Sequence, residues 1–131
     1  MNITVDLNNS KPTYLQIVEC IRRAIAAGAL QPGDQLPTIR EAAVQARVNR
    51  NTVSRAYLEL EHLGLVVNRQ GSGTYVSNNG PTLERKERRK IIQQMVEDLT
   101  LEAYHYQIPI EEVIHMIRES ARKWGKETAN E

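Results

Sequence analysis

The sequence contains no phenylalanine, one tryptophan and one cysteine. Without phenylalanine, the hydrophobic core must be built mainly from aliphatic side chains. The single cysteine, Cys20, excludes a disulfide within the chain and is typical of a reducing compartment. No apolar run approaches the ~20 residues of a transmembrane helix. The first residues, MNITVDLNNSKPTY, lack the basic and apolar regions of a secretion signal, so we expect a cytoplasmic protein.

The chain also lacks a strong net charge. With 17 Lys and Arg against 16 Asp and Glu, its formal charge is +1. Neither end of the chain is strongly charged. Residues 1–77 carry eight basic and six acidic side chains, and residues 78–131 carry nine basic and ten acidic ones. Any DNA binding must therefore come from local placement of cations rather than from bulk charge.

No residues form a recognisable catalytic or metal-binding set. The sequence lacks a Gly-rich phosphate loop ending in Lys-Ser or Lys-Thr, and it lacks a nucleophile elbow. His62, His105, His115 and Cys20 are too sparse to supply the ligands of one metal ion. We therefore expect the protein not to be an enzyme and to hold no cofactor or metal.

The N-terminal part of the chain contains the signals of a short strand and two helices. Residues 3–7, ITVDL, alternate apolar and polar side chains, which predicts a strand. A first helix is expected from Pro12 to Gly28, because proline suits the first turn of a helix and glycine its end. TIREAAVQA opens with a capping box at Thr38 and Glu41 and predicts a short second helix. The residues expected on its inner face are Ile39, Ala42, Ala43 and Ala46.

The stretch VNRNTVSRAY, residues 48–57, predicts a third helix with a dense polar start. Asn49 is a suitable N-cap, and Val48 and Val53 have the spacing of a hydrophobic staple. An apolar stripe faces the core, so the polar residues must lie around the exposed N-terminal end. The stripe consists of Val53, Ala56, Tyr57, Leu60 and Leu63, followed by Gly64. The polar cluster consists of Arg50, Asn51, Thr52, Ser54 and Arg55.

Side chains of these types can bind DNA from the start of a helix. Arginine pairs with guanine or phosphate, asparagine pairs with adenine, and threonine and serine suit phosphate oxygens or thymine methyl groups. The backbone amides at the start of a helix also face phosphate favourably. The alternative is a capped, solvated surface helix, and this helix alone does not decide between the two.

The segment LVVNRQGSGTYV, residues 65–76, predicts a β-hairpin whose glycines, Gly71 and Gly73, permit positive φ at the tip. Three helices followed by a hairpin form the winged helix-turn-helix plan, in which the hairpin is the wing. This plan favours DNA binding, although an ordinary hairpin turn is the alternative for the wing alone. The wing residues expected to approach a minor groove or phosphate are Arg69, Gln70, Gly71 and Ser72.

Two amphipathic helices separated by Pro109 are expected after the polar segment SNNGPT. Such a pair has too little of its own to bury, so we expect two copies of the chain to pack together. The basic run ERKERRK, residues 84–90, favours a solvated helix face over contact with DNA. Tyr104, Tyr106 and Trp124 favour core or interface positions over a small pocket. The expected dimer interface comprises Ile92, Met95, Val96, Leu99, Ile114, Ile117 and Trp124.

The predicted organisation is therefore mainly α-helical with one small β-hairpin. A winged helix-turn-helix domain occupies residues 1–77 and a linker occupies 78–82. A two-helix dimerisation segment follows at 83–126, with a tail at 127–131.

Residues 11–76 closely resemble the DNA-binding domain of the GntR family of transcription regulators. The resemblance rests on PGDQLPTIRE, VNRNTVSRAYLELE and RQGSGTYV, which occur in the family order over about half of the chain. It implies DNA contacts by Arg40 at the start of the second helix and by Gly71 of the wing. Many members carry arginine at the position of Ser54, whereas here Arg55 follows one place later, so either residue is a candidate. The remaining contacts that it implies are Asn49, Arg50, Asn51 and Thr52.

The short C-terminal part resembles that of the small YtrA-like branch of the family. About fifty residues follow the wing, where the family's usual effector domain is much larger. The resemblance implies that these residues form two helices used for dimerisation. It also implies an association with operons for ATP-binding-cassette transporters.

We therefore expect a sequence-specific, double-stranded DNA-binding transcription regulator that acts as a homodimeric repressor of a small operon. Helix 50–63 would enter the major groove and wing 69–73 would lie at the minor groove of a palindromic operator. The protein would be cytoplasmic and associated with the bacterial nucleoid when bound. A small-molecule effector is compatible with this function.

Two other interpretations stay open at this point. A winged helix can bind a protein partner, although the exposed face here is polar and offers little apolar anchor beyond Leu58. The C-terminal helices could instead form the pocket of a metal or small-molecule sensor. Salt-sensitive DNA binding would distinguish the first alternative, and a melting-temperature screen with metals and metabolites the second.

Overall fold

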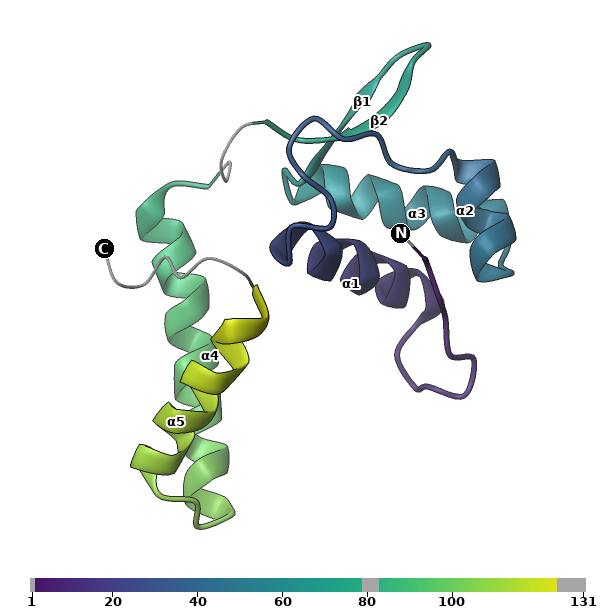
Figure 1. Ribbon diagram of the computed structural model, residues 1–131. Coiled ribbons are helices and arrows are strands. Elements are labelled where there is room, and N and C mark those ends of the chain that lie inside the picture. Colours follow the sequence, from purple (N-terminus) through teal and green to yellow (C-terminus); the bar gives the residue numbers. More distant parts are fainter. Residues whose placement is uncertain (1, 79–82, 125–131) are drawn as a thin grey trace. The chain divides into compact units, whose positions relative to one another are not determined.

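The structure of the protein is a computed structural model that describes residues 2–78 and 83–124 (Figure 1). The chain forms two compact units, Met1–Thr82 and Leu83–Glu131. Most of the predicted linker at 78–82 and all of the predicted tail at 127–131 lie outside the described residues. The first unit contains α1 (Thr13–Ala26), α2 (Ile39–Ala46), α3 (Arg50–His62), β1 (Val66–Arg69) and β2 (Gly73–Val76). The second contains α4 (Arg85–His105), α5 (Ile110–Ala121) and the 3-10 helix η1 (Arg122–Trp124). The predicted mainly α-helical class with one β-hairpin is confirmed.

The first helix, α1, lies where its end signals predict. It begins directly after Pro12, and Gly28 follows its end with a φ of +85°. A glycine is suited to this position because it has no Cβ to oppose positive φ. The buried face of α1 packs against α3 and consists of Ile17, Val18 and Ile21.

Both ends of α2 are fixed by local hydrogen bonds. The predicted capping box is present, because the Glu41 amide donates to Thr38 Oγ1 at 3.0 Å and the Thr38 amide donates to Glu41 Oε1 at 2.9 Å. At the other end, Arg47 adopts left-handed backbone with a φ of 59°. The chain therefore turns sharply after eight residues and leads directly into α3.

A continuous hydrophobic core joins the three helices and the hairpin of the first unit. Tyr57 of α3 lies in this core and donates its hydroxyl hydrogen to the Pro37 carbonyl at 2.7 Å. Burial, and secondarily the carboxylate of Glu41, raise the pKa of Tyr57 above its usual range. The hydrogen bond from the phenol to Pro37 holds α3 to the segment that precedes α2. The largest fully buried side chains are Ile3, Ile17, Ile21, Val53, Leu60 and Val66.

The predicted strand at residues 3–7 is wrong. Ile3 is buried in the core, and Val5 packs at its edge, which accounts for the apolar alternation. The Ile3 amide donates to the side-chain Oε1 of Gln45 at 3.2 Å. Residues 3–6 have no regular secondary structure, Leu7 lies in a turn, and in the described part of the chain only β1 and β2 form a sheet.

The prediction that Ile39 and Leu63 face the core is also wrong. Ile39 is 36% exposed and Leu63 is 42% exposed. Ile39 is the first residue of α2, and Leu63 is the residue that follows α3. Helical periodicity predicts a facing direction only inside a helix, and it fails at these ends.

The wing is a two-stranded antiparallel hairpin in which Val66 pairs with Val76 and Arg69 pairs with Gly73. The Ser72 amide donates to the Arg69 carbonyl at 2.9 Å and closes the turn. Gly71 has a φ of +78° at the third position of this turn, as a type II turn requires. Gly73 has a φ of +139°, so the positive φ predicted for both glycines is confirmed.

A third segment, residues 33–36, runs along the other edge of β2. The Leu36 amide donates to the Thr74 carbonyl and the Val76 amide donates to the Asp34 carbonyl, both at 2.8 Å. Gln35 forms an antiparallel bridge with Tyr75. The base of the wing is therefore joined to the segment from which α2 begins.

The second unit is an αα-hairpin with little burial of its own. Pro109 caps the start of α5, as expected of a residue that separates two helices. Among its described residues, only Ala103 and Val113 are buried. The run at 84–90 forms the cap and first turns of α4, and its side chains are exposed. No helix in the described part of the chain is long and apolar enough to cross a membrane.

Candidate nucleic-acid interface

The helix pair α2–α3 forms a tight helix-turn-helix. Residues 47–49 separate the two helices, and the amide of Val48 donates to the Ala43 carbonyl at 3.1 Å. The Asn51 amide donates to the Asn49 side-chain Oδ1 at 2.7 Å, which confirms Asn49 as the N-cap of α3. This bond occupies the amide oxygen of Asn49 and leaves its NH₂ group available to DNA.

The polar cluster predicted at the start of α3 lies together on the surface. Arg50, Asn51, Ser54 and Arg55 are exposed and Thr52 is half-buried. In the described part of the chain, Arg50 has no ion-pair partner. Its guanidinium is therefore free to donate to an acidic or carbonyl acceptor from outside the protein.

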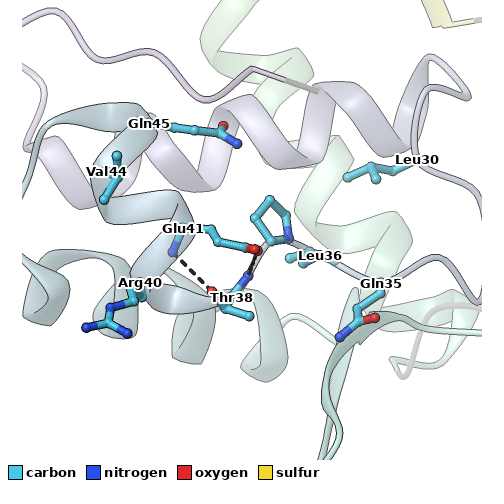
Figure 2. Close-up of a pocket in the computed structure, with 9 residues that line it drawn as sticks. Leu30, Gln35, Leu36, Thr38, Arg40, Glu41, Val44 and Gln45 are labelled. Atoms are coloured by element: carbon cyan, nitrogen blue, oxygen red, sulfur yellow. Dashed lines mark hydrogen bonds between the residues drawn. The ribbon is translucent and has the colours of Figure 1, made fainter.

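Arg40 adds a second exposed guanidinium at the start of α2. Figure 2 shows it extending outward, away from the capping pair Thr38 and Glu41. It lies at the wall of an open groove of about 920 Å³, whose other end is lined by Leu30, Leu36 and Gln35 (Figure 2). Arg40 forms no salt bridge with any residue that the structure describes. The start of each helix in the pair thus exposes one free arginine.

Arg55 and Ser54 lie on different sides of α3. The Arg55 guanidinium carbon lies 3.9 Å from the centroid of the Tyr14 ring, which belongs to α1. Ser54 instead lines a small hollow with Ile39 and with Asn68 of the wing. The two neighbouring candidates therefore have different surroundings, because only Arg55 is held by an aromatic ring.

The four predicted wing residues lie at the tip of the wing, and all of them are exposed: Arg69, Gln70, Gly71 and Ser72. The Arg69 guanidinium carbon lies 4.6 Å from the centroid of the Tyr75 ring. The hydroxyl groups of Ser72 and Tyr75 are 2.6 Å apart and share a hydrogen bond. The tip is thus held by side chains as well as by the strand ladder.

The sequence patterns did not predict three residues that support this site: Tyr14, Gln35 and Tyr75. Tyr75 was within reach of prediction, because Arg69 pairs with Gly73 and a diagonal neighbour two residues along lies on the same face. Tyr14 and Gln35 contact residues far from them in the sequence. No local pattern indicates such contacts.

The residues predicted for the dimer interface lie in the second unit. Ile92, Met95, Val96, Leu99 and Ile117 are exposed, whereas Ile114 and Trp124 are half-buried. A shallow hollow of about 440 Å³ includes Leu99 and Tyr106, but Tyr104 is 79% exposed and outside it. Trp124 does not line this hollow either. The residues that the structure describes contain no cluster of three potential metal ligands.

A short helix pair with free arginines at both helix starts, followed by a β-wing, defines a winged helix-turn-helix DNA-binding domain. Residues 13–76 match the model of the gntR family of bacterial regulatory proteins. The HTH-type transcriptional repressor YtrA of Bacillus subtilis is 34% identical over 117 residues, which cover 89% of this chain and 90% of that protein. The chain belongs to the GntR family of bacterial regulatory proteins. Its relatives are transcription regulators and not enzymes.

Solved structures extend the likeness beyond the winged domain. A transcriptional antiterminator from Listeria monocytogenes matches with a TM-score of 0.84 and 29% identity, covering 98% of this chain and 96% of that one. The DNA-binding domain of AraR, solved in complex with operator ORX1, matches with a TM-score of 0.54 and 30% identity. This second match covers 59% of the chain and 99% of the AraR domain. The AraR domain, which shares this fold, therefore binds operator DNA.

Proposed function

We propose that the protein is a homodimeric repressor that binds a palindromic operator in double-stranded DNA. The observation that carries the proposal is that Arg40 and Arg50, at the exposed starts of α2 and α3, have no ion-pair partner among the described residues. The protein would act in the cytoplasm and be associated with the nucleoid when bound. Repression is proposed because the YtrA relative is named a repressor. Control of a transporter operon follows from the resemblance to the YtrA-like branch alone.

In this proposal α3 lies in the major groove and determines sequence specificity. Arg50 donates two hydrogen bonds to guanine or to a phosphate, and Asn51 pairs with adenine. Arg40 and Thr52, together with the free NH₂ of Asn49, contact the backbone and fix the register. The wing residues Arg69, Gln70, Gly71 and Ser72 approach the adjacent minor groove. Arg55, beside Tyr14 of α1, and Ser54, beside Ile39 and the wing, complete the set.

The second unit supports dimerisation because it leaves its apolar residues in solvent. With only Ala103 and Val113 buried among the described residues, an isolated hairpin gains little from hydrophobic burial. Packing two hairpins together would cover Ile92, Met95, Val96 and Leu99, which follow one face of α4. A two-fold dimer presents two identical winged domains and therefore matches a palindrome.

Selection of binding sites from random duplex DNA tests the proposed function. We expect a palindromic sequence to be enriched, and binding to it to weaken steeply with salt, because phosphate contacts release counterions. Sedimentation velocity of the same protein should give the mass of a dimer. Absence of any enriched sequence, with the protein folded and dimeric, would contradict operator recognition by the unliganded protein.

Arg55→Ala should separate the roles of the two neighbouring candidates. Because Tyr14 holds its guanidinium on the α1 side of α3, we expect Arg55 to contact phosphate rather than a base. Its loss should weaken binding to all sequences alike and lower the salt slope by about 1 for each protomer. Ser54→Ala is the control and should leave the salt slope unchanged. Changed preference at a single base pair in Arg55→Ala, with an unchanged slope, would show that Arg55 reads a base.

A further inference from the structure

We propose that Tyr75 is a positioning residue that orders the wing before DNA arrives, with Gln35 as its support. The inference rests on the proposed function, because it concerns how the wing engages an operator. Neither residue needs to touch DNA in this role. Tyr75 acts on Arg69 and Ser72, and Gln35 acts on the turn that carries Ser72.

Tyr75 holds two tip residues at once. Its ring lies under the Arg69 guanidinium, with 4.6 Å between the guanidinium carbon and the ring centroid. Its hydroxyl group shares a 2.6 Å hydrogen bond with the Ser72 hydroxyl. The attraction between a guanidinium and a ring face needs no hydrogen bond, so N–H groups of Arg69 remain for a phosphate or a base edge. The contact therefore restrains Arg69 without using up all of its donors.

Gln35 fixes the same tip from outside the hairpin. Its side-chain Nε2 donates to the Ser72 carbonyl at 3.2 Å, and its backbone pairs with Tyr75. A Cβ at position 73 would lie 2.6 Å from Gln35 Nε2, so a side chain there would displace the Gln35 amide from Ser72. The φ of +139° at Gly73 also favours glycine. Residue 35 also precedes α2 by only four positions. The wing and the helix that presents Arg40 are thus joined through a short segment.

Ordering Arg69 in advance should raise affinity. An arginine side chain that is free in solution loses rotamer freedom when it binds, and the loss costs about two- to tenfold in affinity for each ordered side chain. A side chain that is already held by Tyr75 has lost part of that freedom before binding. Removing the ring should therefore weaken binding, even though the cation itself is still present.

Four variants of the full-length protein test this inference on the selected operator. Tyr75→Leu removes both contacts, Tyr75→Phe removes only the Ser72 bond, and Arg69→Ala removes the cation. The fourth is the double variant Tyr75→Leu with Arg69→Ala. Binding constants are measured at several salt concentrations, and melting temperatures are recorded for every variant. Leu7→Ala, at an exposed leucine of the N-terminal segment, is the control and should bind like the wild type.

We expect Arg69→Ala to lower the salt slope by about 0.9 for each protomer, as for a lost phosphate contact. Tyr75→Leu should bind the operator about two- to tenfold more weakly than the wild type. Tyr75→Phe should keep most of the wild-type affinity because it keeps the ring. In the double variant, Tyr75→Leu should add little to Arg69→Ala, since the ring then has no guanidinium to hold. Additive losses, or wild-type affinity in Tyr75→Leu, would overturn the inference.

Gln35→Met gives an independent measurement, because it removes the bond to the Ser72 carbonyl while keeping side-chain length. It should weaken binding with an unchanged salt slope, and wild-type affinity would remove Gln35 from the support. Failure of the proposed function is distinguishable from failure of this inference. If the wild type binds no selected duplex, operator recognition fails. If the wild type binds and Arg50→Ala weakens binding while Tyr75→Leu does not, only the inference fails.

Discussion

Val96→Glu is expected to convert the protein from a dimer to a monomer and to weaken operator binding about a hundredfold or more. Val96 is 44% exposed in the single chain and lies in the apolar row on α4. A glutamate there would be desolvated without a partner when two copies pack, which is costly enough to prevent association. The monomer would hold one half-site only and would lose the gain of about 10²–10⁴ that linked binding sites provide. Sedimentation velocity and operator titration measure the two effects.

Leu101→Glu is the matched control for this experiment. It makes the same kind of change on the same helix, at a leucine that is 55% exposed. Five residues separate it from Val96, which places it about 140° around the helix. We expect this variant to remain dimeric and to bind the operator normally. A dimeric Val96→Glu protein would show that the interface does not include this face of α4.

Arg50→Ala is expected to weaken operator binding by about 1–3 kcal/mol for each half-site. Arg50 is the first residue of α3, and its exposed guanidinium has no ion-pair partner in the described part of the chain. Bidentate contact with guanine or a charged contact with phosphate would be lost. If a base contact is lost, the variant should also relax selectivity at one position of each half-site. Fluorescence anisotropy with the selected operator and its single-base variants measures both quantities.

Arg22→Ala is the control for Arg50→Ala. Arg22 is an exposed arginine of α1 whose guanidinium already lies 3.5 Å from the Glu19 carboxylate. Its removal should change neither affinity nor selectivity. Thermal melting should show that both variants are folded. Unchanged operator affinity in a folded Arg50→Ala protein would remove Arg50 from the DNA-binding surface.

The parts of the fold that depend on neighbouring residues could be predicted from the sequence. Thr38 and Glu41 cap α2 through bonds that span three residues, and Asn49 caps α3 through a bond that spans two. Gly71 has the positive φ that the tight turn of the wing requires. In each case the pattern and the interaction that it predicts lie within one turn of the chain.

The contacts that shape the candidate site depend instead on residues distant in the sequence. Gln35 bonds to Ser72, which lies 37 positions away, and Tyr14 meets Arg55 only after α1 and α3 have packed. Ile3 resembles a strand residue because it is buried, but its amide is bonded to a side chain 42 positions away. Periodicity reports that a side chain is buried and gives no information about its partner. The polar residues of α3 could thus be identified from the sequence, whereas their supports could not.

The small core of the second unit affects how the protein would be degraded in the cell. Ala103 and Val113 are the only buried residues in the part of this unit that the structure describes, so an unassembled chain would hold α4 and α5 together weakly. Proteases cleave segments that open, at a rate set by how often they open. If the protein acts as the proposed dimer, newly made chains that have not met a second copy would therefore be degraded first. Turnover would then match the supply of the regulator to its assembly, and chains able to occupy only half of an operator would not accumulate.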